Sequence, residues 1–158
     1  MEGPVRTGEV EAVRVLIATP HDLDARRLGD ILSGAAGFDV VDHAHDGASA
    51  VGLAELLRPD LILLDTELPL LNAVEATPVL RRKVPQATIV VLTPIDSGAG
   101  GRLAMRLGAH GHLCRSSGAS VLLGLVRAAL PLSLRGRSAR TGGALASEPD
   151  GDDEEVSA

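Results

Sequence analysis

The sequence of 158 residues contains no tryptophan and no tyrosine, and its one phenylalanine is Phe38. A hydrophobic core must therefore be built from Leu, Val, Ile and Ala side chains. The scarcity of aromatic rings nearly excludes the stacking on bases by which many proteins bind single-stranded nucleic acids. Cysteine is equally scarce, since Cys114 stands alone. No disulfide can form within the chain, which fits a reducing compartment.

Lysine is almost absent as well, because Lys83 is the one lysine beside fourteen arginines. Six of the 21 acidic residues lie between Glu148 and Glu155, so the formal net charge of −6 belongs to this tail. The balanced remainder offers no basic footprint for nucleic acid. No secretory signal and no apolar run of about 20 residues is present. We expect a cytoplasmic protein that binds neither nucleic acid directly nor a membrane.

Short apolar runs alternate with helical patterns between residues 13 and 130, as expected for a parallel sheet covered on both faces. The predicted strands are Val13–Ala18, Phe38–Ala44, Leu61–Asp65, Ala87–Thr93 and Gly111–Cys114. The predicted helices are Asp22–Ser33, Asp46–Leu57, Asn72–Arg82, a stretch around Arg102–Leu107, and Ser117–Leu130. Right-handed crossovers leave few arrangements for five such units. We predict a single doubly wound α/β domain with strand order 2-1-3-4-5.

The ends of these elements carry further signals. Asp22, Asp46 and Asn72 are predicted N-caps, and Asn72 with Glu75 has the spacing of a capping box. The sequence SGAGG at residues 97–101 weakens the fourth helix by about 1 kcal/mol for each glycine, so we expect its start to be frayed or absent. The folded domain should span residues 13–131, between a disordered arm at 1–12 and a disordered acidic tail at 132–158.

Asp65 ends the third predicted strand, in the sequence LILLDTELP. The carboxyl ends of the strands, beside the switch point next to strand 1, are where open α/β sheets carry function. The alternative is that this aspartate has only a structural role and caps the loop that follows the strand. The interpretation of Asp65 therefore depends on the sequence around it.

Four segments occur in order at suitable spacing: RVLIATPH, RPDLILLDTELP, a strand ending in VVLT, and GAHGHLCR. Over residues 13–130 the sequence resembles the receiver domain of two-component response regulators, especially those that carry a helix-turn-helix output domain. The resemblance implies a flavodoxin-like fold and a place in phosphorelay signalling. It also implies a phospho-accepting aspartate, a loop proline, a hydroxyl that senses the phosphoryl group, an aromatic switch position and a lysine position, which here are Asp65, Pro69, Thr93, His112 and Arg115.

The first strand departs from that family pattern. It normally ends in two acidic residues that help to hold Mg²⁺, and Thr19 and Pro20 stand there instead. Asp22 and Asp24 are better placed in the first turn of the following helix. Mg²⁺ requires near-octahedral oxygen coordination, and phosphoryl transfer depends on the charge that the metal neutralises. We therefore expect a degenerate acidic pair, weak or lost Mg²⁺ binding and no cofactor.

Arg115 replaces the lysine, and its planar guanidinium suits pairing with a carboxylate. One interpretation is a direct pair with Asp65 that makes the pocket neutral without a metal ion. The alternative is a solvated arginine at the end of a strand.

The histidines have spacings that suggest a metal site. His43 with His45, and His110 with His112, would each share a face of an extended strand. Zinc needs about four convergent ligands, and the two pairs belong to opposite edges of the predicted sheet. We predict no metal site. For His112, a partly exposed position on the edge strand is an equally good interpretation. Cys114 should be a small buried apolar residue.

The last predicted helix is apolar around most of its circumference. If Val121, Leu122, Leu125 and Ala129 face the sheet, the side chains left partly outward are Leu123, Val126 and Leu130. Exposed apolar patches mark interaction sites. We predict a homodimer, or a complex with another receiver or regulatory protein, through the face of the fourth helix, fifth strand and fifth helix.

These features predict a binding module rather than an enzyme. It would be an atypical receiver that acts through protein contacts, largely independently of Mg²⁺-assisted phosphorylation. Its tail is too short and polar to be the usual DNA-binding domain. One alternative is a receiver still phosphorylated on Asp65 by a histidine kinase, which would then be a partner. Another is a small-molecule sensor that uses the cleft above Asp65 and Thr93.

Overall fold

The computed structural model describes residues 11–94 and 98–137. Its centre is one five-stranded sheet in the order β2-β1-β3-β4-β5, in which all neighbouring strands are parallel. The strands are β1 (Val13–Ala18), β2 (Phe38–Ala44), β3 (Leu61–Asp65), β4 (Thr88–Thr93) and β5 (Gly111–Cys114). The predicted flavodoxin-like fold and strand order are confirmed, and the strand bounds differ from the predicted ones only at the start of β4.

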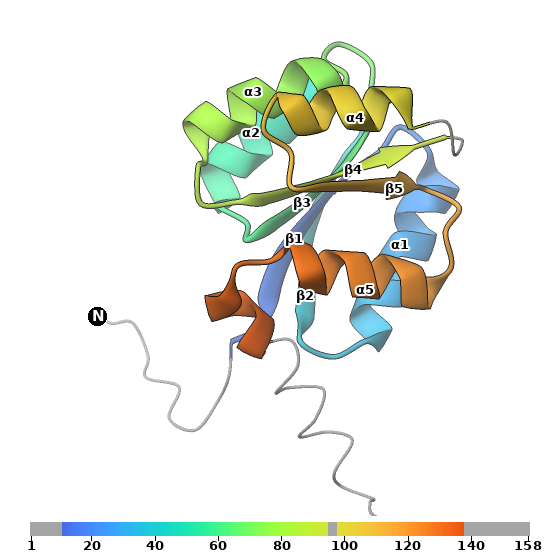
Figure 1. Ribbon diagram of the computed structural model, residues 1–158, viewed down its shortest axis with the longest axis vertical. Coiled ribbons are helices and arrows are strands. Elements are labelled where there is room, and N and C mark those ends of the chain that lie inside the picture. Colours follow the sequence, from blue (N-terminus) through green and yellow to red (C-terminus); the bar gives the residue numbers. More distant parts are fainter. Residues whose placement is uncertain (1–10, 95–97, 138–158) are drawn as a thin grey trace, which may run out of the picture.

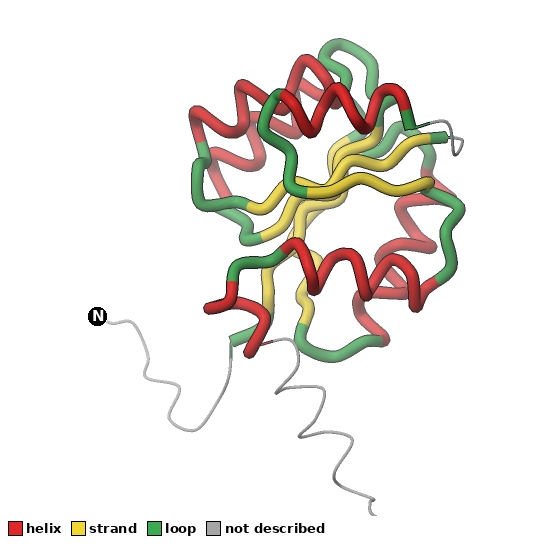
Figure 2. The backbone as a smooth tube through the Cα atoms, viewed as in Figure 1, coloured by secondary structure: helices red, strands yellow, loops and turns green. Residues whose placement is uncertain are grey.

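Five helices cover the two faces of the sheet (Figure 1). They are α1 (Asp22–Gly34), α2 (Gly47–Leu57), α3 (Ala73–Lys83), α4 (Ala99–Arg106) and α5 (Ala119–Ala129). One face carries α1 and α5, and the opposite face carries α2, α3 and α4, so the sheet is the middle of three layers (Figure 2). Alternate residues of the central strands enter the two cores. In β3, for example, Leu61 and Leu63 pack towards α1 and α5, whereas Ile62 and Leu64 pack towards the other helices.

The predicted caps are confirmed at two of three helices. The Asp46 side chain accepts a hydrogen bond from the backbone N–H of Ser49, and Asn72 forms a complete capping box with Glu75. At α1 the N-cap is His21, and Asp22 is the first helical residue. Backbone conformation decides this difference, because His21 has the extended φ and ψ of a cap.

The start of α4 is formed, contrary to the expectation that glycines would fray or remove it. Gly98 is the N-cap with a left-handed φ of 73°, and Gly100 and Gly101 lie within the helix. A Cβ on Gly101 would lie 2.4 Å from Nδ1 and 2.8 Å from Cβ of His112. The missing side chain thus provides the space in which the His112 ring packs under α4.

This packing makes glycine preferable to alanine at residue 101. Replacement of Gly101 by alanine should lower the free energy of unfolding, even though alanine favours a helix by about 1 kcal/mol. Gly124→Ala in α5 is the matched control, because a Cβ there has no neighbour within 4 Å and should stabilise the fold. Urea denaturation of both variants measures whether each substitution lowers or raises the free energy of unfolding. Equal stabilisation by both would show that His112 does not occupy this space.

Residues 132–137 form a short helix, so the first part of the predicted disordered tail is ordered. Leu134 is 7% exposed and joins the core beneath α1 and α5. Arg135 donates hydrogen bonds to the carbonyl oxygens of Leu130 and Ala128 at 2.7 Å each. The buried Leu134 side chain and the hydrogen bonds of Arg135 together anchor this turn. Residues 1–10 and 138–158 lie outside the described residues.

The predicted orientation of the last helix is partly wrong. Leu122 is in the core as predicted, and Leu125 and Ala129 pack against it. Leu122, Val126 and Leu130 are at most 1% exposed and pack against the sheet, and Leu123 is half-buried beside them. Val121, which was assigned to the core, is 57% exposed. The spacing of four from Leu122 to Val126 to Leu130 defines the centre of the buried stripe, and Leu125 and Ala129 lie at its border.

Candidate functional site

Asp65 lies at the carboxyl end of β3 and its side chain is fully buried. Its Oδ1 atom accepts hydrogen bonds from the backbone N–H of Glu67 at 2.8 Å and from Nη1 of Arg115 at 3.1 Å. Its Oδ2 atom accepts from the Thr19 hydroxyl at 2.9 Å and from the same Nη1 at 2.9 Å. A carboxylate has about four acceptor positions, so all of those on Asp65 are in use.

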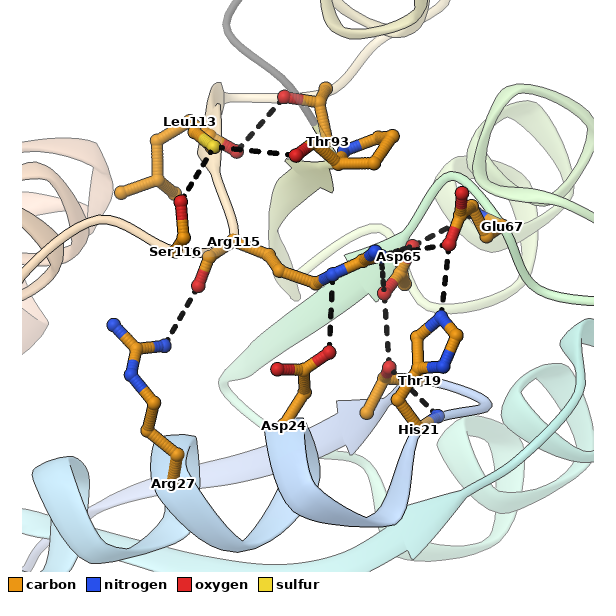
Figure 3. Close-up of polar contacts among 12 residues, drawn as sticks. Thr19, His21, Asp24, Arg27, Asp65, Glu67, Thr93, Leu113, Arg115 and Ser116 are labelled. Atoms are coloured by element: carbon orange, nitrogen blue, oxygen red, sulfur yellow. Dashed lines mark hydrogen bonds and ion pairs between the residues drawn. The ribbon is translucent and has the colours of Figure 1, made fainter.

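Arg115 follows β5, and its guanidinium lies among three carboxylates (Figure 3). Besides Asp65, Nη1 contacts Oε1 of Glu67 at 3.0 Å, and Nε contacts Oδ2 of Asp24 at 3.1 Å. The Arg115 side chain is 17% exposed. The predicted contact between Asp65 and Arg115 is confirmed, and the solvated alternative for Arg115 is wrong.

The charge balance differs from the expected one-to-one pair. Three carboxylates surround one guanidinium, and Glu67 also contacts the imidazole of His21 at 2.9 Å. The hydrogen bond with His21, followed by that with Arg115, lowers the pKa of Glu67, although partial burial opposes this shift. Burial disfavours the charged form of Arg115, but attraction to Asp65 and Glu67 outweighs it and raises its pKa. Both shifts favour the charged forms of Glu67 and Arg115.

The first turn of α1 and the loop after β5 position these groups. Asp24 lies in the first helical turn, as predicted from the sequence, but its side chain reaches the pocket. Arg27, one turn later, donates to the backbone carbonyl oxygens of Arg115, at 2.7 Å, and of Ser117. Arg27 therefore ties α1 to the chain segment that carries Arg115 (Figure 3).

The site contains four further residues that were not predicted as its members: His21, Asp24, Arg27 and Glu67. Asp22 and Asp24 look alike in the sequence, yet a two-residue spacing places them on different sides of a helix. Asp24 contacts Arg115, whereas Asp22 contacts His45 at 3.1 Å. The first helical turn after strand 1 is the signal by which Asp24 could have been found.

The remaining predicted site residues are distributed around the pocket rather than within it. The Thr93 hydroxyl donates to the carbonyl oxygen of Leu113 at 3.4 Å. Pro69 lies in the loop after β3, where its carbonyl oxygen accepts from Gly47 at the start of α2. Pro20 follows Thr19 in the loop after β1 and is half-buried, and His112 packs under α4. Cys114 is partly exposed rather than buried, with its sulfur 3.1 Å from the Ser116 hydroxyl.

The residues of the pocket do not fit Mg²⁺. Six oxygen ligands at near-octahedral angles are the requirement of this ion. Here both oxygens of Asp65 already accept their full number of hydrogen bonds, and the guanidinium of Arg115 lies at the point to which the three carboxylates converge. Across residues 11–94 and 98–137, no group of three His, Cys, Asp or Glu side chains is arranged to hold a metal ion.

The histidine pairs also remain apart in the structure. His43 and His45 lie on the α1 side of the edge strand β2 and line a cavity of about 510 Å³. His110 and His112 belong to the opposite edge strand, β5, and the turn before it. None of the helices in the described part of the chain is both long and apolar enough to cross a membrane.

The sequence profile of the family described as response regulator receiver domain matches residues 15–127. The nitrate/nitrite response regulator protein NarP of Escherichia coli (strain K12) is 35% identical over 120 residues, which are 76% of this chain and 56% of the relative. The transcriptional regulatory protein DegU of Brevibacillus brevis is 32% identical over 115 residues, which are 73% and 49% of the two chains. The chain spans about half the length of these curated relatives.

Solved structures show the same similarity. The signal receiver domain of the response regulator NarL from Mycobacterium tuberculosis superposes with a TM-score of 0.70 at 27% identity. The match covers 75% of this chain and 97% of that domain. The similarity thus extends over a whole receiver domain.

Proposed function

The chain belongs to the response regulator receiver domain family of two-component signalling, and from this premise we propose that it is an atypical receiver in which Arg115 takes the place of the metal ion. Such a receiver signals through protein contacts rather than through Mg²⁺-assisted phosphorylation of Asp65. It is a binding module and catalyses no reaction of its own.

The hydrogen bonding of Asp65 carries this proposal. A carboxylate that attacks a phosphoryl group needs a free lone pair, and catalysis of this transfer rests on positioned positive charge. Both Asp65 oxygens accept from Nη1 of Arg115, and each accepts one further hydrogen bond. Nucleophilic attack by Asp65 would therefore first require that Arg115 leave the pocket.

Millimolar Mg²⁺ should not raise the melting temperature of the protein, because only a ligand that binds the native state stabilises it. Thermal unfolding with increasing MgCl₂, at constant ionic strength, measures this effect. CaCl₂ is the matched control for nonspecific effects of a divalent salt. A saturable rise with Mg²⁺ that disappears in Asp65→Asn would contradict the proposal.

A phospho-accepting receiver is the second candidate function, and the position of Asp24 favours it. Asp24, Asp65 and Glu67 all reach Arg115, so movement of this one side chain would leave three carboxylates without their cation. A histidine kinase would be the phosphoryl donor in that case. Formation of an acyl phosphate in the unmodified protein, and its loss in Asp65→Asn, would decide for this candidate.

We further propose that the face formed by α4, β5 and α5 binds a partner, with a second copy of the chain as the simplest one. Of the predicted Leu123, Val126 and Leu130, the last two are buried and Leu123 is half-buried, so other side chains supply most of the exposed apolar surface. Leu103 in α4 and the C-cap residue Leu107 are 43% and 38% exposed, and Val121 is exposed on α5. Both helices flank the edge strand β5. Exposed apolar surface beside an edge strand can mark an interaction site.

The full chain should be dimeric at micromolar concentration in light scattering. Leu103→Glu combined with Val121→Glu should give a folded monomer, because both substitutions place a charge on the proposed contact. Leu56→Glu is the matched control: Leu56 is 76% exposed on α2, and its variant should remain dimeric. A monomeric wild-type protein at high micromolar concentration would rule out self-association through this face.

A further inference from the structure

Helix α1 contacts Arg115 at two places, once at its backbone and once at its side chain. The backbone carbonyl oxygen of Arg115 accepts a hydrogen bond from Nη1 of Arg27 at 2.7 Å, and its Nε atom lies 3.1 Å from Oδ2 of Asp24. Residues three apart in a helix lie on the same face, so Asp24 and Arg27 leave α1 on one side. Figure 3 shows both side chains reaching from α1 towards the segment of Arg115. We call Asp24 and Arg27 the α1 clamp.

Arg27 fixes the backbone from which the Arg115 side chain starts. Its two terminal nitrogens donate to the carbonyl oxygens of Arg115 and Ser117, so one guanidinium spans the turn after β5. The same turn is closed by a hydrogen bond of 3.0 Å from the N–H of Ser117 to the carbonyl oxygen of Cys114. Hydrogen bonds from a charged donor are stronger than neutral ones, and the planar fork of arginine fixes their geometry. The start of the Arg115 side chain is therefore held relative to α1.

Asp24 fixes the other end of the same side chain. Nη1 of Arg115 has two N–H groups but faces three oxygen atoms, the two of Asp65 and Oε1 of Glu67. These contacts attach the guanidinium through one nitrogen, about which a planar group can still pivot. The contact of Nε with Asp24 is a second point of attachment. Two points define the plane of the guanidinium, and this offsets the rotamer entropy that a long side chain loses when it is ordered.

The neighbours of the same residue types in α1 point elsewhere. Arg26 is exposed and lines the cavity between α1 and β2, on a different side of the helix from Arg27. Asp22 contacts His45 of β2 at 3.1 Å, whereas Asp24 contacts Arg115. The rotation of α1 about its axis thus selects one aspartate and one arginine for the pocket. Each of them has a natural control of the same type within two residues.

We propose that Asp24 and Arg27 are positioning residues that hold Arg115 over Asp65, so that the placement of α1 determines whether Asp65 is covered. The inference rests on the proposed function, in which Arg115 takes the place of the metal ion. While the clamp holds, both oxygens of Asp65 stay bonded to Nη1 of Arg115. Movement of α1 away from the turn after β5 breaks the contacts of Asp24 and Arg27 together, because both residues belong to one helix. The clamp is thus a latch on the carboxylate.

Rotation of the Arg115 guanidinium about its Nε–Cζ bond, followed by ¹⁵N NMR of the full chain at pH 7, tests the clamp. This rotation exchanges Nη1 with Nη2, and the bonds from Nη1 to both oxygens of Asp65 should make it slow enough to give two separate signals. Their loss in Arg115→Met assigns them. In Arg27→Met the rotation should be at least about tenfold faster, which corresponds to about 1.4 kcal/mol. Arg26→Met is the matched control and should leave the rate unchanged.

A second pair of variants tests the carboxylate of the clamp and keeps the size of the side chain. Asp24→Asn should also accelerate the rotation, because it removes the negative charge beside Nε, whereas Asp22→Asn should not. A wild-type rate in folded Arg27→Met or folded Asp24→Asn would overturn the proposal for that residue and leave the proposed function standing. A single averaged Nη signal in the wild-type chain would show that Arg115 is not fixed over Asp65. That result would contradict the proposed function and the clamp together.

Discussion

Replacing Arg115 by methionine is expected to lower the free energy of unfolding by about 3–5 kcal/mol, the usual effect of leaving a buried charge without its partner. Asp65 is fully buried, and Asp24 and Glu67 would face it with no cation between them. Methionine retains much of the arginine stem, so the change mainly removes charge and hydrogen bonds. Urea denaturation at pH 7 without divalent ions measures the loss.

A double-mutant cycle measures the interaction energy between Asp65 and Arg115 separately from the other contacts of each residue. Asp65→Asn combined with Arg115→Met should cost clearly less than the sum of the single changes, because the second substitution removes the stranded charge. Arg106→Met, at an exposed position of α4, is the control and should change stability by no more than about 0.5 kcal/mol. An effect of Arg115→Met as small as this control would mean that Arg115 does not balance the buried carboxylate.

Restoring the family's usual residues should create a Mg²⁺ site in this pocket. The triple variant with Thr19→Asp, Pro20→Asp and Arg115→Lys places two new carboxylates beside Asp65 and removes the guanidinium that saturates it. Without metal, repulsion among these carboxylates should destabilise the fold. Mg²⁺ at ten times its dissociation constant should return about 1.4 kcal/mol. For a domain of this size, the melting temperature should then rise by about 5 °C.

Partial variants identify which departure matters. Thr19→Asp with Pro20→Asp alone should bind Mg²⁺ poorly, because Arg115 still occupies the point where the carboxylates converge. Arg115→Lys alone should also bind poorly, since it adds no ligand. If the triple variant shows no saturable response to Mg²⁺, these three departures do not account for the proposed loss of Mg²⁺ binding.

Much of the fold could be predicted because short apolar runs are diagnostic of strands buried on both faces. The bounds of β1, β2, β3 and β5 follow directly from where apolar character begins and ends. The starts of α2 and α3 likewise follow from their N-cap residues, Asp46 and Asn72. These signals are local, and the crossover rule then leaves few ways to order the strands.

The errors arose where contacts between distant residues decide the outcome. The faces of α5 are apolar almost all round, so its periodicity could not indicate that Val126 is buried and Val121 exposed. Glycine propensity disfavoured the start of α4, but the need to accommodate His112 overrides it. Residues 132–137 are held by Leu134, which reaches the core, and by hydrogen bonds from Arg135 to the end of α5.

In the site, too, one contact could be predicted from the strands, whereas others depend on the packing of distant segments. The contact between Asp65 and Arg115 was predictable because β3 and β5 are parallel strands whose carboxyl ends lie on the same side of the sheet. The convergence of Asp24 and Glu67 on the same guanidinium depends on the orientation of a helical turn and a loop. No sequence pattern specifies either orientation.

Beryllofluoride with Mg²⁺, which mimics an acyl phosphate on aspartate, tests the central claim most directly. An NMR titration should follow the backbone amides of Asp65 and Thr93 in the wild-type protein, with Asp65→Asn as the control. Because Arg115 occupies the cation position and saturates the carboxylate, neither amide should shift. Saturable shifts of both amides that vanish in Asp65→Asn would show that Arg115 yields to a metal ion and that Asp65 still accepts a phosphoryl group.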